Sequence, residues 1–238
     1  MIDFICFDVE SAKHIVDALR DRVGLFLHCG TLWVHGVPKM RPYDETFPRK
    51  PFGDYGIKKA RTERFLLDSA SDGFPAAVLH PGHITGPGWN PINPAGNLDT
   101  AVFQRLATGE KVYLPDDGMA TLQHVHADDV AQAFDLAIAR PEAAIGESFH
   151  VASRLAVSMR EYAEGVASWS RREANLEFLP WAEWRKTVSE RDAALTRDHV
   201  EHSPWASIAK AEQRLGFVPR YSALDAVRDA VTRNSSGN

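Results

Sequence analysis

Short apolar runs alternate with segments of helical periodicity along the first half of the chain. Residues 2–7, 25–29 and 76–80 form largely apolar runs, which are typical of strands buried on both faces of a parallel sheet. Between the first two runs, apolar residues recur at helical spacing in a segment that Ser11 is expected to cap. A longer helix is predicted over 53–70. This alternation predicts a parallel sheet with right-handed crossovers.

The second half of the chain begins with an irregular segment and ends in helices. Residues 81–97 hold four prolines and four glycines, which argues against regular structure there. A helix over 127–140 and a strand over 148–151 follow. Ser158 and Ser222 each stand three positions before an acidic residue, and these pairs predict capping boxes that open two further helices.

These patterns predict an α/β protein, with a doubly wound, Rossmann-like parallel sheet and a small, mostly helical C-terminal lobe. The sheet part is assigned to 1–90 and 122–152, and the substrate-binding lobe to 91–121 and 153–233. A cleft between the two parts is expected to hold the substrate, because open α/β sheets bind ligands beyond the carboxyl ends of their strands. The polar residues 234–238 are expected to form a disordered tail.

Composition and charge narrow the class of protein. The 27 basic residues stand against 32 acidic ones, a net charge of −5 that does not favour nucleic acid or an anionic membrane as a partner. No run approaches the roughly 18 apolar residues of a membrane span. Cys6 and Cys29 both lie in apolar runs, so a reducing, cytoplasmic setting is expected. His124 and His126 share one face of a strand, but with no cysteine nearby no metal site is expected.

The sharpest chemical motif is a tyrosine, Tyr55, followed four residues later by Lys59 at the start of a predicted helix. Positions i and i+4 share a helix face, so the ammonium can lie beside the phenol. A unit charge about 4 Å away at an effective dielectric of about 20 contributes about 4 kcal/mol, or roughly three pKa units. That would bring the phenol pKa near neutrality, where it can act as general acid or base. Thr31 adds a hydroxyl at the end of a predicted strand. Taken alone, a tyrosine followed four residues later by a lysine is more often merely a pair on the protein surface.

Further landmarks place this motif in a family context. Thr-Leu-Trp-Val-His-Gly at 31–36 resembles the Ser or Thr that stands three residues before Val-Tyr-Gly in the extended short-chain dehydrogenase/reductase family. His-Pro-Gly-His-Ile-Thr-Gly-Pro-Gly at 80–88 resembles the family's Arg-Pro followed by Tyr-Gly-Pro-Gly. Later matches are His-Val-His-Ala-Asp-Asp-Val-Ala at 124–131 and Leu-Gly-Phe-Val-Pro at 215–219. The chain thus resembles the epimerase/dehydratase branch of that family over almost its whole length.

The resemblance implies a function and a set of site residues. The function is NAD- or NADP-dependent oxidation, reduction or epimerisation at a hydroxyl or carbonyl of a sugar-like small molecule. Tyr55 would be the catalytic acid or base, Lys59 would lower its pKa and hold the nicotinamide ribose, and Thr31 would hydrogen-bond the substrate oxygen. Three backbone positions would lie against the nicotinamide carboxamide: Pro81, Gly82 and His83.

The chain departs from the family at its beginning and at two later positions. The family opens with a strand, Gly-x-x-Gly-x-x-Gly and a helix, and nothing before Asp3 supplies them, so an N-terminally truncated sheet without the phosphate loop is expected. NAD and NADP are therefore not distinguished, and the alternative is a non-catalytic truncated relative or fragment that cannot hold the dinucleotide. His80 stands where the family often has arginine. Ala120 stands where nucleotide-sugar epimerases commonly carry an arginine for the diphosphate, which weakens the case for a nucleotide sugar.

The opening run also bears on assembly. Ile2, Phe4, Ile5 and Phe7 resemble a strand that needs cover on both faces. Without neighbouring strands this region is expected to leave an open apolar edge. The sequence therefore predicts a homo-oligomer, self-association through the N-terminal strand region, or a chain that is part of a longer folded protein.

Overall fold

The computed structural model describes residues 1–236, and these fall into two units. The first unit comprises Met1–Gly82, Ala127–Arg154 and Ala206–Arg220, and the second comprises the rest of the described chain. Both units are assembled from segments far apart in the sequence, because the chain leaves the first unit and returns to it twice.

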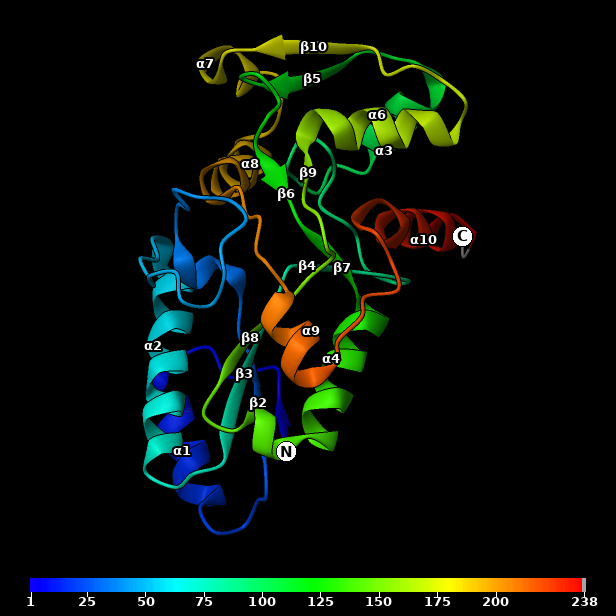
Figure 1. The fold of residues 1–238 in the computed structure, drawn as a ribbon. Helices are drawn as coiled ribbons and strands as arrows, with labels where there is room; N and C mark the ends of the chain where they lie inside the picture. The colour runs from blue at the N-terminus through cyan, green and yellow to red at the C-terminus, as the bar shows by residue number, and fades with distance from the viewer. Residues whose placement is uncertain (237–238) are drawn as a thin grey trace. The chain divides into compact units, whose positions relative to one another are not determined.

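A four-stranded parallel sheet forms the centre of the first unit (Figure 1). Its strands stand in the order β1 (Ile2–Asp3), β2 (Phe26–Cys29), β3 (Ala76–Pro81) and β8 (Ser148–Val151). Every residue of β2, β3 and β8 is buried, as their apolar runs predicted. Strands buried on both faces need cover on both sides of the sheet.

Helices supply that cover on both faces (Figure 1). On one side α1 (Val9–Leu19) and α2 (Gly53–Ser71) pack against each other and share an apolar core with β2 and β3. On the other side α4 (Ala127–Ala139), α5 (Pro141–Ala144) and α9 (Ala209–Leu215) pack together. A parallel sheet between two helical layers confirms the predicted doubly wound α/β class.

The first strand and the first helix differ from the prediction at their ends. β1 holds two residues instead of the predicted six, because the Asp3 carboxylate accepts the N–H groups of Ile5 and Cys6 at 3.0 Å each and turns the chain out of the sheet. Asp8, and not Ser11, caps α1, and its Oδ1 accepts the Ser11 N–H at 2.8 Å. Asp8 has the extended backbone that an N-cap requires (φ −148°, ψ 165°).

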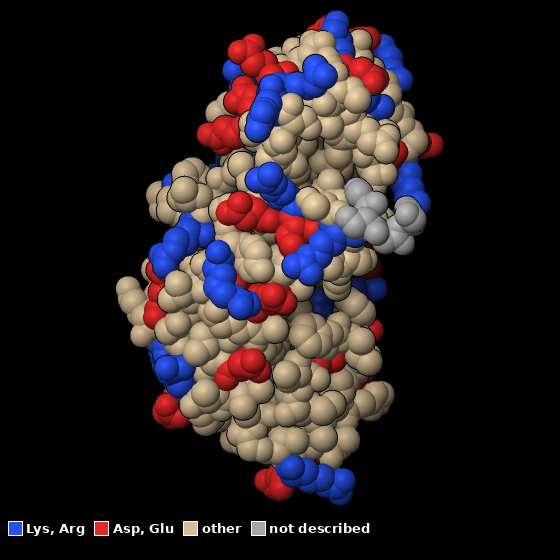
Figure 2. Space-filling view, turned by 90° about the vertical axis from the view of Figure 1, so that its right-hand side faces the viewer, with Lys and Arg blue, Asp and Glu red and all other residues tan. Residues whose placement is uncertain are grey.

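The residues after β1 leave an apolar surface uncovered. Phe4 is 51% exposed, Ile5 82% and Phe7 50%. A hollow of about 430 Å³ opens beside β1, and apolar residues line most of it: Met1, Val23, Leu25, Leu27, Ile138 and Pro141. Figure 2 shows that charged side chains are sparse over a broad area of one face of the molecule. The predicted open apolar edge is therefore present.

The second unit, as far as it is described, holds three strand pairs and five helices. The pairs are β4 (His83–Thr85) with β7 (His124–His126), β5 (Val112–Pro115) with β10 (Leu176–Leu179), and β6 (Thr121–Leu122) with β9 (Val157–Ser158). The helices are α3 (Ala101–Thr108), α6 (Met159–Trp169), α7 (Trp181–Trp184), α8 (Glu190–His202) and α10 (Ala223–Ser236). β4 lies inside the segment expected to be irregular, because its main chain pairs with β7. In the described chain no helix is both long and apolar enough to cross a membrane.

The boundaries of the two units differ from the predicted division. Residues 206–220 belong with the sheet, where the Lys210 ammonium donates to the Glu147 carboxylate and to the Ser148 carbonyl at 2.8 Å each. Residues 83–90 and 122–126 belong with the second unit instead of the first. These differences follow from long-range contacts that local patterns do not encode.

The predicted disordered tail is wrong for part of its length. α10 continues to Ser236, so residues 234–236 are helical. The Asn234 side chain accepts the Gly88 N–H at 2.8 Å and donates to the Trp89 carbonyl at 2.9 Å. These two bonds tie the end of the helix to a turn of the same unit. Residues 237–238 lie outside the described part of the chain.

Candidate active site

The carboxyl end of β2 leads to the first predicted site residue, Thr31. A 3₁₀ turn, η1 (Leu32–His35), begins there, and the Thr31 hydroxyl caps it by accepting the Trp33 N–H at 3.3 Å. The Thr31 N–H donates to His80 Nδ1 at 2.9 Å. A Cβ on the preceding Gly30 would lie 2.3 Å from that nitrogen, so the position requires glycine. Thr31 is therefore held through both its backbone and its hydroxyl.

Tyr55 lies in the first turn of α2, and the Thr31 hydroxyl lies close enough to its phenol to lower the pKa of the phenol. Its ring packs against Phe7 and Trp33 at centroid distances of 6.5 and 5.9 Å, yet the residue stays 43% exposed. Burial raises the pKa of the phenol, and the nearby Thr31 hydroxyl opposes this only in part. The predicted fall of the Tyr55 pKa toward neutrality is therefore wrong for this structure.

Lys59 lies one turn beyond Tyr55 and is 2% exposed. Its ammonium donates to the carbonyls of Cys6 at 3.0 Å and Cys29 at 2.8 Å, and lies 3.4 Å from His28 Nε2. These three contacts use all three N–H bonds of an ammonium, so none is directed to Tyr55. Lys59 is not among the groups that shift the pKa of the phenol. Burial lowers the pKa of Lys59 itself.

A buried histidine–aspartate pair stands behind Lys59. His28 Nδ1 lies 2.8 Å from Asp3 Oδ2, and the two side chains are 0% and 3% exposed. Because Nδ1 donates to the carboxylate, Nε2 keeps its lone pair for the ammonium. Burial by itself would raise the pKa of Asp3, but hydrogen bonds from His28 and two backbone amides lower it overall. Burial lowers the pKa of His28, which keeps the ring neutral beside the lysine.

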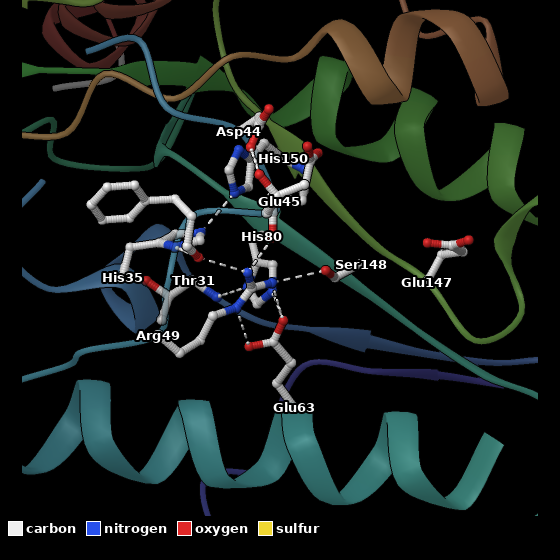
Figure 3. A network of polar contacts seen from close by, with 12 residues as sticks. Thr31, His35, Asp44, Glu45, Arg49, Glu63, His80, Glu147, Ser148 and His150 are labelled. Atoms are coloured by element: carbon white, nitrogen blue, oxygen red, sulfur yellow. Dashed lines mark hydrogen bonds and ion pairs between the residues drawn. The ribbon is translucent and has the colours of Figure 1, made fainter. Parts of the chain in front are cut away.

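A second polar network joins Thr31 to α2 and β8 (Figure 3). His80 on β3 binds the Thr31 N–H through Nδ1 and lies 2.9 Å from Glu63 Oε1 through Nε2. Arg49 pairs with the same carboxylate through Nε at 3.2 Å and Nη2 at 2.6 Å. Burial would raise the pKa of Glu63, but His80 and Arg49 together hold it well below its usual range. Arg49 also donates to Ser148 Oγ at 3.0 Å, which ties this network to β8.

The network continues through two more histidines. His35 Nε2 and His150 Nε2 lie 2.9 Å apart, with ring planes at 86°. The His150 N–H donates to the buried Glu45 carboxylate at 2.7 Å. Burial lowers the pKa of His35 to about 3, keeps that of His150 far below its usual value, and raises that of Glu45. These groups fasten the loop before α2 to β8 (Figure 3).

The three predicted carboxamide contacts lie in different surroundings. Pro81 ends β3, and the Gly82 N–H donates to a carbonyl at the end of β8 at 2.9 Å. His83 opens β4 in the second unit, where its ring lies 5.5 Å from that of His124 and 4.9 Å from that of His199. Burial and these neighbouring rings hold the pKa of His83 well below its usual value. The part of these residues in cofactor binding stays a prediction.

The structure brings Thr31 and Tyr55 together and directs Lys59 to backbone carbonyls. It also places polar residues at the site that sequence reasoning missed: Asp3, His28, Glu45, Arg49 and His150. The only signal for three of them was a polar side chain inside an apolar run, whereas Glu45 and Arg49 lie in a loop rich in proline and charge, where no periodicity indicates a contact. Within the part of the chain that the structure describes, no group of three or more His, Cys, Asp or Glu side chains is arranged to hold a metal ion.

A profile of the NAD dependent epimerase/dehydratase family matches residues 2–152. The chain belongs to this family. It is 26% identical over 230 residues to UDP-glucose 4-epimerase of Corynebacterium glutamicum, an alignment that covers 91% of this chain and 65% of the relative. It is 34% identical over 127 residues to dTDP-L-rhamnose 4-epimerase of Burkholderia thailandensis, covering 52% of this chain and 34% of the relative. The family resemblance drawn from the motifs is thereby confirmed.

Solved structures of the same kind share the fold. UDP-glucuronic acid 4-epimerase from Bacillus cereus, in complex with NAD, matches with a TM-score of 0.72 and 18% identity over 96% of this chain and 67% of that chain. At this level of sequence identity the likeness shows a shared fold and does not by itself identify the function of this chain. The chain spans about half the length of the curated relatives it matches.

Proposed function

We propose that the chain supplies the acid–base residues of an NAD- or NADP-dependent enzyme that oxidises, reduces or epimerises at a hydroxyl or carbonyl carbon of a sugar-like small molecule. The observation that carries this proposal is the placement of two side-chain hydroxyls beyond the carboxyl end of β2. The Thr31 hydroxyl accepts the Trp33 N–H, and the Trp33 ring packs at 5.9 Å on that of the partly exposed Tyr55. Two neighbouring hydroxyls can bind one substrate oxygen, and a phenol can give or take its proton. Membership of the family supports the reaction class.

Tyr55 is the proposed general acid or base. Its raised pKa keeps the phenol protonated at neutral pH, which suits proton donation to a carbonyl oxygen during reduction. Thr31 would bind the same oxygen, and because its hydroxyl lowers the pKa of the phenol, it makes the phenolate less unfavourable in the oxidative direction. A bound nicotinamide dinucleotide supplies the hydride acceptor or donor.

Lys59 is the proposed ligand of the nicotinamide ribose. Its longest contact is the one with His28 Nε2, at 3.4 Å, against 2.8 and 3.0 Å to the two carbonyls. A ribose hydroxyl can therefore take that N–H with the smallest loss of existing hydrogen bonding.

The described residues fit the nicotinamide end of the cofactor better than the pyrophosphate. A pyrophosphate is bound by backbone N–H groups where a glycine-rich turn opens a helix after a strand. In residues 1–236, no strand of the four-stranded sheet leads through such a turn into a long helix. The link before α1, residues 4–8, has no glycine, and the close-set glycines from Gly82 to Gly88 lead through β4 into an irregular segment. We therefore expect this chain to bind the dinucleotide weakly, so assays need it in excess.

The residue at position 120 bears on the class of substrate. The curated relatives carry UDP-glucose and dTDP-L-rhamnose in their names, and both compounds are nucleotide sugars. Ala120 has no charge to bind a diphosphate, at the position where nucleotide-sugar epimerases commonly carry an arginine. A sugar-like hydroxyl compound is therefore proposed, and the alternative is a non-catalytic relative that keeps the Thr31–Tyr55 pair without holding a dinucleotide.

A turnover assay with two tyrosine variants tests the proposal. The chain is incubated with NAD or NADP and a panel of sugars and nucleotide sugars, and reduced nicotinamide and sugar products are followed. We expect Tyr55→Phe to lower turnover by about 10²–10⁴-fold, because the proton donor is lost. Tyr113→Phe is the matched control, since Tyr113 is a 38% exposed tyrosine of the second unit. Undiminished turnover in Tyr55→Phe would refute the acid–base role, and no turnover by the unmodified chain would favour the non-catalytic alternative.

A further inference from the structure

His80 makes two hydrogen bonds that together allow one protonation state (Figure 3). Its Nδ1 accepts the Thr31 N–H at 2.9 Å, so this nitrogen carries no proton. Its Nε2 lies 2.9 Å from Glu63 Oε1, so this nitrogen carries the proton and donates it. The ring is 0% exposed, and no solvent competes for either nitrogen. His80 is therefore a neutral imidazole in the Nε2–H tautomer.

The surroundings of the ring fix it from both sides. The Glu63 carboxylate that selects the tautomer is itself held by two bonds from Arg49, at 3.2 and 2.6 Å. On the Nδ1 side the chain carries Gly30, where a Cβ would lie 2.3 Å from the nitrogen. The Thr31 N–H reaches the ring only because position 30 has no side chain. The hydrogen bond between Thr31 and His80 thus requires both the glycine at position 30 and the histidine at position 80.

A single residue connects His80 to the proposed acid–base pair. The Thr31 N–H binds His80, whereas the Thr31 hydroxyl accepts the Trp33 N–H at 3.3 Å. The Trp33 ring in turn packs on the Tyr55 ring, with centroids 5.9 Å apart. We propose that His80 is a positioning residue that holds the Thr31 hydroxyl beside the Tyr55 phenol, with Glu63 selecting the His80 tautomer that accepts the Thr31 N–H. The meaning of that placement for catalysis rests on the proposed function, but the positioning does not.

Two substitutions separate the two nitrogens of the ring. His80→Asn places an amide oxygen where Nδ1 stands, so Thr31 keeps its acceptor while the bond to Glu63 is lost. His80→Gln places an amide N–H where Nε2 stands, so Glu63 keeps its donor while Thr31 loses its acceptor. If His80 has a purely structural role, the two variants should disturb Thr31 equally, or His80→Asn should disturb it more. If His80 positions Thr31, His80→Gln should disturb Thr31 more than His80→Asn does.

Two readouts report the position of Thr31 without any turnover. Exchange of the Thr31 amide hydrogen, followed by NMR, is expected to be about five- to tenfold faster in His80→Gln, the loss of one hydrogen bond, and within about twofold of the unmodified chain in His80→Asn. Because the nearby Thr31 hydroxyl lowers the pKa of the phenol, the titration of Tyr55 should move upward in His80→Gln and stay in place in His80→Asn. Thr31→Val, which lacks the hydroxyl, sets the upper limit of that shift.

A measurement on the unmodified chain covers the case in which a variant does not fold. The ¹⁵N shifts of His80 should show an unprotonated Nδ1 and a protonated Nε2 at neutral pH. A protonated Nδ1, or equal responses of the two variants on Thr31 exchange and Tyr55 titration, would overturn the proposal. A Tyr55 titration that Thr31→Val leaves unmoved would instead remove the Thr31–Tyr55 contact, and with it the proposed function. If all these readouts respond as expected and Tyr55→Phe retains turnover, the positioning stands and the acid–base role falls.

Discussion

Charges at the candidate site are carried by buried residues, whereas the exposed residue is a neutral phenol. Asp3, Lys59 and Glu63 are 4%, 2% and 2% exposed, and Tyr55 is 43% exposed. A buried charge must be paired or fully hydrogen-bonded to persist, and each of the three has such partners. The buried charged residues therefore contribute to the local stability of the site, whereas the pKa of the phenol is set by its own burial.

Replacing Lys59 tests how much stability its ammonium contributes. Lys59→Met keeps most of the apolar stem but leaves the carbonyls of Cys6 and Cys29 buried without their donor. We expect the free energy of unfolding, measured in urea, to fall by about 2–4 kcal/mol, the cost of two unsatisfied acceptors. Lys58→Met is the control, because Lys58 is about half exposed and pairs with Asp54 on the helix surface, so its loss should change stability by less than about 0.5 kcal/mol. Equal effects of the two variants would contradict this.

The buried histidine His124 gives a pH dependence with a definite sign. Burial lowers its pKa to about 3 in the folded chain, against about 6.5 when unfolded, so only the unfolded chain binds a proton there between these values. Stability is therefore present above about pH 6.5 and is lost as the pH falls, by up to about 1.4 kcal/mol per pH unit for this group. His124→Gln keeps the Nε2–H donor near the Ile92 carbonyl, 3.2 Å away, and removes the titration.

We expect His124→Gln to flatten the fall of the unfolding free energy between about pH 6 and pH 4.5, when urea unfolding is repeated across that range. The exposed residue His14 provides the matched control, His14→Gln. A slope that His124→Gln leaves as steep as in the unmodified chain would show that the buried ring is not the group responsible.

Among the elements, those with long apolar patterns were predictable and those decided by one polar side chain were not. α2, β3, α4 and β8 lie within one or two residues of their predicted bounds, because periodicity and apolar runs report burial directly. The length of β1 and the start of α1 depend on Asp3 and Asp8, whose carboxylates take backbone N–H groups. A hydropathy pattern does not encode which backbone groups a carboxylate will take.

The same limit explains the candidate site. Thr31 and Tyr55 were predictable, because a strand end and a helix start bring them to one edge of the sheet. The orientation of Lys59 was not, because it depends on the Cys6 carbonyl, which the turn at Asp3 brings over the lysine. The Arg49 bonds to Glu63 join residues 14 positions apart across an irregular loop, and no periodicity reports such a contact.

The first helix offers a direct test of its corrected start. Asp8→Ala removes the carboxylate that accepts the Ser11 N–H, and we expect it to lower the free energy of unfolding by about 1 kcal/mol. Ser11→Ala is the control, since Ser11 lies inside the helix and its change should stay within about 0.5 kcal/mol. Thermal or urea unfolding of both variants decides the matter. A larger loss in Ser11→Ala would return the cap to the position predicted from the sequence.

On the scale of the whole molecule, the first unit leaves an apolar region uncovered beside β1. The region runs from the exposed Ile5 and Phe7 to Phe4, whose ring lies 5.1 Å from that of Phe134 on α4. Monomers rarely expose contiguous apolar patches above a few hundred Å². An open strand edge adds unpaired backbone groups that another chain can pair with. A net charge of −5 is too small to keep such surfaces apart.

We therefore predict that the chain self-associates through this N-terminal region. Sedimentation over rising concentration should show a mean mass growing above the 26.4 kDa of one chain. Ile5→Lys should shift that equilibrium toward the monomer by about tenfold or more, because it places a charge on an 82% exposed apolar side chain at the proposed contact. Val218→Lys is the matched control, an exposed apolar residue (54%) of the same unit outside this region. A soluble monomer at high concentration, or equal effects of the two lysines, would show that the uncovered edge does not drive association.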